Sequence, residues 1–159
     1  MNDTPIILIV DDDPLMLTGV AAVLNMSGYE CHCARDSEAA LKAVRGLTLD
    51  LIICDMNVDG DSGLELCQEM RSEPGAEDVP VIFVSTEAKG ADAIKQLHAA
   101  GGFYYLRKPF DHDVLVSLVD KALWMPHLVN TKLGLVEHAS STTRSTPNFW
   151  RPAAVTRNA

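Results

Sequence analysis

Five short segments rich in apolar residues alternate along the chain with longer segments whose apolar residues recur every three to four positions. Most of the short segments are nearly continuous runs of Val, Ile, Leu or Phe, which is typical of strands covered on both faces of a parallel sheet. We therefore predict five strands, at Ile6–Val10, Tyr29–Ala34, Leu51–Cys54, Val81–Ser85 and Phe103–Arg107.

The longer segments begin with capping residues and end near glycine, as helices do. Asp13, for example, stands where an N-cap precedes a proline of the first helical turn. The predicted helices run from Pro14 to about Ser27, from an Asp36 or Ser37 cap to near Gly46, from Ser62 to about Glu73, from Ala91 to Ala100 and from Asp111 to about Trp124. This alternation predicts an α/β fold, a single doubly wound five-stranded parallel sheet with five flanking helices.

The alternating pattern stops after Met125 and Pro126. We predict one domain in residues 1–125. Residues 126–159 are rich in Ser and Thr, carry four basic residues and one acid, and lack the apolar residues for a second core. This composition predicts a mildly basic tail that is flexible or serves as a linker.

The formal net charge is −9, and the excess of acids lies in residues 1–125. An acidic body argues against broad contact with nucleic-acid phosphates and favours a cation site. No apolar run is long enough to cross a membrane, and the N-terminal MNDTP lacks the basic residues of a signal peptide, so we expect a cytoplasmic protein. The four cysteines lack the spacing of a zinc site and are expected to be reduced.

Polar side chains gather at the predicted carboxyl ends of the strands, where open α/β sheets bind ligands. Asp11 and Asp12 follow the first strand, Asp55 the third, Ser85 ends the fourth, and Lys108 follows the fifth. Clustered carboxylates repel, and a hard divalent cation such as Mg²⁺ relieves that repulsion. A carboxylate can also act as a nucleophile and form an acyl phosphate, so the set is chemically complete for phosphorylation of Asp55.

Other acids near this edge have simpler interpretations. Asp13 is interpreted as a helix cap, and Asp59 and Asp61 as solvated loop acids. Ser85 alone would be interpreted as a packed residue at a strand end; its motif favours a functional role.

Four motifs, IILIVDDDP, LIICDMNVDGDSG, VIFVSTEAK and YLRKPF, occur in this order and resemble those of the receiver domain of two-component response regulators. The resemblance covers residues 5 to about 124 and is to the chemotaxis-type, single-domain receivers. It implies a flavodoxin-like fold with strand order 2-1-3-4-5. It also implies that Asp55 is the phosphoacceptor, which takes its phosphoryl group from a histidine kinase or a phosphotransfer protein.

The same resemblance implies a site for Mg²⁺ or Mn²⁺ beside Asp55. Asp12 matches the acid that binds the metal directly, and Asp11 its neighbour that acts largely through water. Asn57 matches the residue whose backbone carbonyl is a ligand.

The resemblance also implies a switch. Ser85 matches the hydroxyl residue that contacts the phosphoryl group, Tyr105 the aromatic residue that moves with it, and Lys108 the lysine that pairs with it. The Lys108–Pro109 peptide is expected to be cis.

Two features modify this picture. Asp59 stands where the family usually has proline, which is expected to loosen the loop; the added acid could attract a cation or hinder a donor. Asn57 and Glu87 occupy positions that tune the lifetime of the acyl phosphate, and their polar side chains suggest quick autodephosphorylation.

We therefore predict a signalling switch that acts through protein contacts, and not an enzyme with a separate substrate. Phosphorylation would repack the face of the fourth helix, fifth strand and fifth helix, which could also form a homodimer. The downstream partner is unknown, and nucleic acid is not expected to bind the receiver.

Two alternatives stay open. One is a receiver-like scaffold that is not phosphorylated. The other is an aspartyl-nucleophile phosphatase using Asp11 and Asp13, which would leave Asp55 and the Lys-Pro-Phe motif unexplained. No effector pattern follows residue 125, so the chain is either a stand-alone receiver or a fragment of a longer regulator.

Overall fold

The computed structural model describes residues 3–86 and 103–124. Its centre is a five-stranded sheet in the order β2-β1-β3-β6-β7, and every neighbouring pair is parallel. The strands are β1 (Ile6–Val10), β2 (Glu30–Ala34), β3 (Leu51–Asp55), β6 (Val81–Ser85) and β7 (Phe103–Arg107). In chain order these are the five predicted strands, so the predicted order 2-1-3-4-5 is confirmed.

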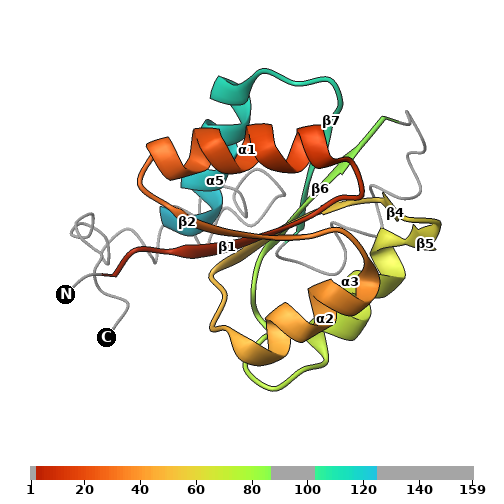
Figure 1. Cartoon of the computed structure of the whole chain (residues 1–159). Coiled ribbons are helices and arrows are strands. Elements are labelled where there is room, and N and C mark those ends of the chain that lie inside the picture. Colours follow the sequence, from red (N-terminus) through yellow and green to blue (C-terminus); the bar gives the residue numbers. More distant parts are fainter. Residues whose placement is uncertain (1–2, 87–102, 125–159) are drawn as a thin grey trace, which may run out of the picture.

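Four helices flank the sheet in the described part of the chain. They are α1 (Pro14–Met26), α2 (Ser37–Gly46), α3 (Gly63–Arg71) and α5 (His112–Trp124). In Figure 1, α1 and α5 lie on one face of the sheet, and α2 and α3 on the other. The predicted helix at 91–100 and the predicted tail at 126–159 lie outside the described residues.

Local sequence explains where the helices begin. The side chain of Asp13 accepts a hydrogen bond from the backbone N–H of Leu15, and Asp36 accepts one from Ala39. Ser62 does the same for α3. Each cap satisfies a backbone donor that the first helical turn leaves without a partner. The interpretation of Asp13 as a helix cap is thereby confirmed.

The sheet separates two apolar cores because alternate strand residues point to opposite faces. Leu8 and Val10 belong to the core under α2 and α3, whereas Ile7 and Ile9 belong to the core under α1 and α5. Both sets are buried, as their nearly continuous apolar run predicts. The central strands are therefore held on both faces, which fixes the position of their carboxyl ends.

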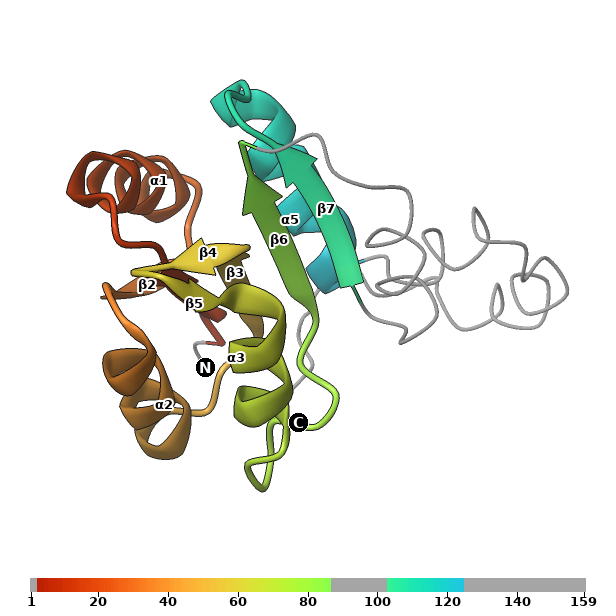
Figure 2. The same ribbon diagram turned by 90° about the vertical axis from the view of Figure 1, so that its right-hand side faces the viewer.

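The loop after β3 contains a small antiparallel hairpin of β4 (Asn57–Val58) and β5 (Asp61–Ser62). Figure 2 shows it in front of the sheet, beside the start of α3. Its two turn residues, Asp59 and Gly60, have φ angles of 53° and 88°. Positive φ at both positions is the geometry of a type I′ turn, for which Asp-Gly is a preferred pair. The segment with Asp59 thus forms a closed two-residue turn. The loosening expected from Asp59 stays a prediction.

A hydrogen-bonded group joins Tyr29, which lies between α1 and β2, to α5. The Tyr29 hydroxyl donates to Asp120 and accepts from the Trp124 indole N–H at 3.1 Å. Burial, followed by the bond to Asp120, raises the pKa of Tyr29 above its ordinary value. This group links the residue just before β2 to the end of α5.

All four cysteines are free, which agrees with the prediction that they are reduced. Cys33 is exposed, Cys31 is half-buried, and Cys54 and Cys67 are buried. Burial raises the pKa of Cys31 to about 12 and that of Cys67 to about 11. Thiols with such pKa values are chiefly packing residues at neutral pH.

Within residues 3–86 and 103–124, no helix is long and apolar enough to cross a membrane.

Candidate functional site

The carboxyl ends of the parallel strands bring four predicted residues to one edge of the sheet. Asp11 follows β1, Asp55 ends β3, Ser85 ends β6 and Lys108 follows β7. These strands are neighbours in the order β1-β3-β6-β7, so their ends lie side by side. The predicted convergence is therefore present in the structure.

Lys108 joins two of the acids directly. Its Nζ donates to Asp11 Oδ2 at 2.9 Å and to Asp55 Oδ2 at 2.6 Å. The side chain of Asp11 is only 1% exposed, and those of Asp55 and Lys108 are 13% and 16% exposed. Water screens such charges less than it screens charges on an open surface, so the pairing governs the electrostatics of the site.

The pKa shifts have opposing causes. Burial raises the pKa of Asp11, and the hydrogen bond from Lys108 only partly offsets this effect. Burial alone would lower the pKa of Lys108, but its hydrogen bonds to Asp55 and Asp11 outweigh it and raise that pKa. Lys108 therefore stays charged at neutral pH and acts as a fixed cation between the two acids.

The hairpin supplies hydrogen bonds to the same acids. The backbone N–H of Asn57 donates to Asp55 Oδ1 at 2.8 Å, and that of Asp59 donates to Asp12 Oδ2 at 2.9 Å. Asp12 is otherwise exposed. Each of these two carboxylates is thus oriented by a main-chain donor from one hairpin.

Asn57 lies beside Asp55 as predicted, but its side chain serves the turn. Its Oδ1 accepts a hydrogen bond from the backbone N–H of Gly60 at 3.1 Å. The predicted contribution of this side chain to water attack on an acyl phosphate stays a prediction, as does that of Glu87, which lies outside the described residues.

The two predicted switch residues have different positions. Ser85 is buried, and its backbone carbonyl accepts a hydrogen bond from the backbone N–H of Lys108 at 2.8 Å. Tyr105 is half-buried and packs against the core under α2 and α3. The Lys108–Pro109 peptide is cis, as expected.

Sequence reasoning missed Gly63, the first residue of α3. A Cβ atom at this position would lie 1.9 Å from the backbone oxygen of Asp55. The backbone N–H of Gly63 also donates to the carbonyl of Met56 at 2.8 Å. Only glycine permits this close approach of α3 to the end of β3. A glycine directly after a Ser cap was the available signal.

The donor set of the site fits a hard divalent cation. Asp11, Asp12 and Asp55 offer carboxylate oxygens, the ligands that Mg²⁺ and Mn²⁺ prefer, while Lys108 compensates only one of the three charges. Within residues 3–86 and 103–124, no three acidic, His or Cys side chains already form a ready-made metal cluster. Mg²⁺ does not require one, because it commonly binds through one or two carboxylates and keeps several waters.

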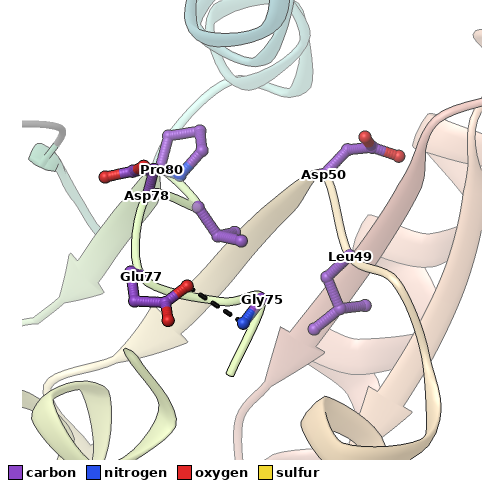
Figure 3. Close-up of a pocket in the computed structure, with 7 residues that line it drawn as sticks. Leu49, Asp50, Gly75, Glu77, Asp78 and Pro80 are labelled. Atoms are coloured by element: carbon purple, nitrogen blue, oxygen red, sulfur yellow. Dashed lines mark hydrogen bonds between the residues drawn. The ribbon is translucent and has the colours of Figure 1, made fainter. Parts of the chain in front are cut away.

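A pocket lies away from these residues. It is lined by Leu49, Asp50, Gly75, Glu77, Asp78, Val79 and Pro80. Figure 3 shows the Glu77 carboxylate bonded to the backbone N–H of Gly75, at 2.9 Å. Asp50 and Pro80 precede β3 and β6, so the pocket lies at the amino ends of these strands. It is therefore at the opposite end of the sheet from Asp55.

A doubly wound sheet with an acid–lysine cluster at its carboxyl edge defines a receiver-type domain. The chain belongs to the response regulator receiver domain family, whose sequence model matches residues 7–120. This confirms the resemblance inferred from the four motifs and makes the domain part of a two-component signalling system.

Curated relatives cover the same region. DNA-binding response regulator MtrA of Mycolicibacterium smegmatis is 33% identical over 113 residues, which are 71% of this chain and 48% of that protein. Phosphate regulon transcriptional regulatory protein PhoB of Pseudomonas aeruginosa is 32% identical over 117 residues, 74% of this chain and 51% of that protein. The chain thus spans about half the length of these two relatives.

Solved structures show the same fold. Chemotaxis protein CheY4 of Vibrio cholerae is similar with a TM-score of 0.71 at 26% identity, covering 76% of this chain and 100% of that chain. The receiver domain of the Francisella response regulator 1452 has a TM-score of 0.66 at 26% identity, covering 76% and 97%. The predicted fold class is confirmed by these structures.

Proposed function

We propose that Asp55 accepts a phosphoryl group from a histidine kinase or a phosphotransfer protein, with Mg²⁺ or Mn²⁺, and that its phosphorylation switches a signalling contact. One observation carries the proposal: Lys108 Nζ lies 2.6 Å from Asp55 Oδ2 and 2.9 Å from the buried Asp11. A cation this close to the carboxylate can compensate the negative charge of a phosphoryl group that the carboxylate accepts.

In the proposed reaction, an Asp55 oxygen attacks the phosphorus of a phosphohistidine donor. A new P–O bond forms as the P–N bond breaks, and the histidine nitrogen keeps the electron pair of the broken bond. Lys108 neutralises a phosphoryl oxygen, and the Asn57 N–H holds the second Asp55 oxygen at 2.8 Å. A bound divalent cation, held by Asp11 and Asp12, would shield the remaining phosphoryl charge.

The output would come from repacking. Ser85 ends β6, which pairs with β3, and Tyr105 lies on β7, the next strand. A new charge at Asp55 would therefore be next to β6 directly and would reach the end of β7 through Lys108. Two packings of these side chains would present different faces to a partner around β7 and α5. This face is also our candidate for homodimer formation, and the downstream partner is a protein of unknown identity.

We further propose that the protein works in the cytoplasm and turns over no separate metabolite. Its chemistry would be limited to its own phosphorylation and dephosphorylation. Hydrolysis of a generic phosphate ester would instead favour the phosphatase alternative.

Acetyl phosphate with Mg²⁺ tests the proposal directly. Mass spectrometry should find one added phosphoryl group on the wild-type chain and none on Asp55→Ala. Asp78→Ala, which removes an exposed acid at the opposite end of the sheet, is the matched control and should be modified like wild type. An unmodified wild type, or a modified Asp55→Ala, contradicts the proposal, and the first result favours the scaffold alternative. The hypothesis of quick autodephosphorylation fails if the label survives for many hours.

A further inference from the structure

The hairpin reaches two acids of the site through its main chain, not through its side chains. The Asn57 N–H binds Asp55, and the Asp59 N–H binds Asp12 at 2.9 Å. Asp12 lies 47 positions earlier in the chain, after a different strand. One hairpin therefore connects the carboxylates at the carboxyl ends of β1 and β3.

The turn geometry determines which residues can make the second bond. Asp59 has a φ of 53°, in the left-handed region that Gly, Asn and Asp adopt most easily. Proline has φ fixed near −65° and no N–H, so it could neither adopt this turn nor donate to Asp12. Asparagine and glycine satisfy both requirements.

The hairpin is itself anchored, so it can hold a carboxylate in place. Val58 is fully buried in the core under α2 and α3. Asp61 Oδ2 accepts a hydrogen bond from the Ser37 hydroxyl at 2.8 Å, which ties β5 to the start of α2. The side chain of Asn57 closes the turn through Gly60. These contacts hold the hairpin, and with it the Asp59 N–H, in a fixed position.

We propose that Asp59 is a positioning residue, whose backbone N–H orients the Asp12 carboxylate for cation binding. This inference rests on the proposed function, in which Asp12 holds the metal. A carboxylate oxygen pair has more acceptor sites than one N–H occupies, so Asp12 can keep this bond and still bind a cation. Partners of metal ligands typically change metal affinity about tenfold or more when they are lost, because they fix the ligand's orientation.

The charge of the Asp59 side chain offers a competing explanation. A nearby acid could raise cation affinity by simple attraction, without any contact to Asp12. The two explanations predict different cation affinities for Asp59→Asn, which removes the charge but keeps the backbone N–H and can adopt the φ of the turn.

Amide NMR tests the contact without any metal or phosphodonor. In wild type, the Asp59 amide proton should be shifted downfield and protected from exchange. Asp12→Ala should remove both signs, and Asp12→Asn, which keeps an acceptor oxygen, should restore much of them. The Asn57 amide, which binds Asp55, is the internal control and should be unchanged. The inference is overturned if the shift and the exchange protection of the Asp59 amide proton are the same in Asp12→Ala as in wild type.

Calorimetric titration with MgCl₂ tests the consequence. We expect Asp59→Pro to bind Mg²⁺ about tenfold more weakly than wild type, and Asp59→Asn and Asp59→Gly to stay within about threefold. Equal losses for Asp59→Asn and Asp59→Pro would favour charge and overturn the inference. If Asp59→Pro does not fold, the amide measurement still decides, because it uses wild type and the Asp12 variants.

These results are separable from the proposed function. A wild type that binds no Mg²⁺ contradicts the proposed function, whatever the Asp59 variants do. A wild type that binds Mg²⁺ as tightly as a folded Asp59→Pro contradicts only the positioning role.

Discussion

Replacing Lys108 with methionine removes the cation between two acids while keeping a side chain of similar length. In the wild type its Nζ lies 2.9 Å from Asp11 and 2.6 Å from Asp55. The variant leaves the Asp11 carboxylate, 1% exposed, without this counter-charge and brings no new donor. We expect Lys108→Met to be less stable than wild type at neutral pH.

The size of the effect follows from burial. Removing one partner of a buried ion pair destabilises a fold by about 3–5 kcal/mol, because the other charge stays buried. Lys108 and Asp55 keep some contact with water, so the lower end applies, about 3 kcal/mol. For a domain of this size, that corresponds to a fall in melting temperature of roughly 10 °C.

The loss should depend on pH in a definite direction. Burial raises the pKa of Asp11 above its ordinary value even with Lys108 present. A raised folded-state pKa contributes stability below the unfolded pKa, and that stability is lost as pH rises through the folded value. Without Lys108 the pKa rises further, so Asp11 takes up a proton more easily. The destabilisation by Lys108→Met should therefore be largest near pH 8 and shrink toward pH 5.

Urea unfolding followed by circular dichroism at pH 5 and pH 8 measures both effects. Lys42→Met, which removes an exposed lysine on α2, is the matched control and should change stability by less than about 0.5 kcal/mol. A Lys108→Met variant as stable as wild type at pH 8 would refute the reasoning. So would a loss that grows as pH falls.

Three further results are expected. Gly63→Ala should destabilise the fold by at least about 2 kcal/mol, because its Cβ would lie 1.9 Å from a backbone oxygen of β3; Gly46→Ala, with open space around its Cβ, should be neutral or mildly stabilising in the same urea assay. Tyr29→Phe should lower the free energy of unfolding by about 1–2 kcal/mol, since two partners on α5 lose their hydrogen bonds to the hydroxyl. Because the folded state keeps Tyr29 protonated, the wild type should lose stability as the pH rises above the ordinary tyrosine pKa, and the variant should lose less. Alkylation at pH 8 should modify exposed Cys33 before Cys31, whose pKa burial raises to about 12; peptide mapping that finds Cys31 first contradicts this.

The strands were predictable because burial on two faces produces nearly continuous apolar runs in the sequence, whereas their order was implied by the resemblance to the receiver family. Runs such as Ile6–Val10 have no polar member, which excludes a half-solvated strand. The convergence of Asp11, Asp55 and Lys108 followed from this, since parallel strands end at one edge. Pattern and topology together thus predicted the main residues of the candidate site.

Other features depend on contacts that residue types do not specify. The sequence shows that Lys108 lies near acids, but not that it joins Asp11 to Asp55. The hairpin was not predicted, because strands of two residues are too short to show a periodicity. The Asp59-Gly60 pair was interpreted as part of a polar loop. Position 63 requires glycine because α3 begins very close to the backbone of β3, and residue types alone do not specify such a contact.

The tethered ammonium of Lys108 has a consequence for ionic strength. A cation fixed to the chain within 3 Å of its partners does not have to be taken up from solution, as free Na⁺ or K⁺ would have to be. Because the pair is largely buried, dissolved salt also screens it less than it screens an exposed pair. The resting charge balance of this edge should therefore stay nearly constant when the surrounding concentration of monovalent salt changes.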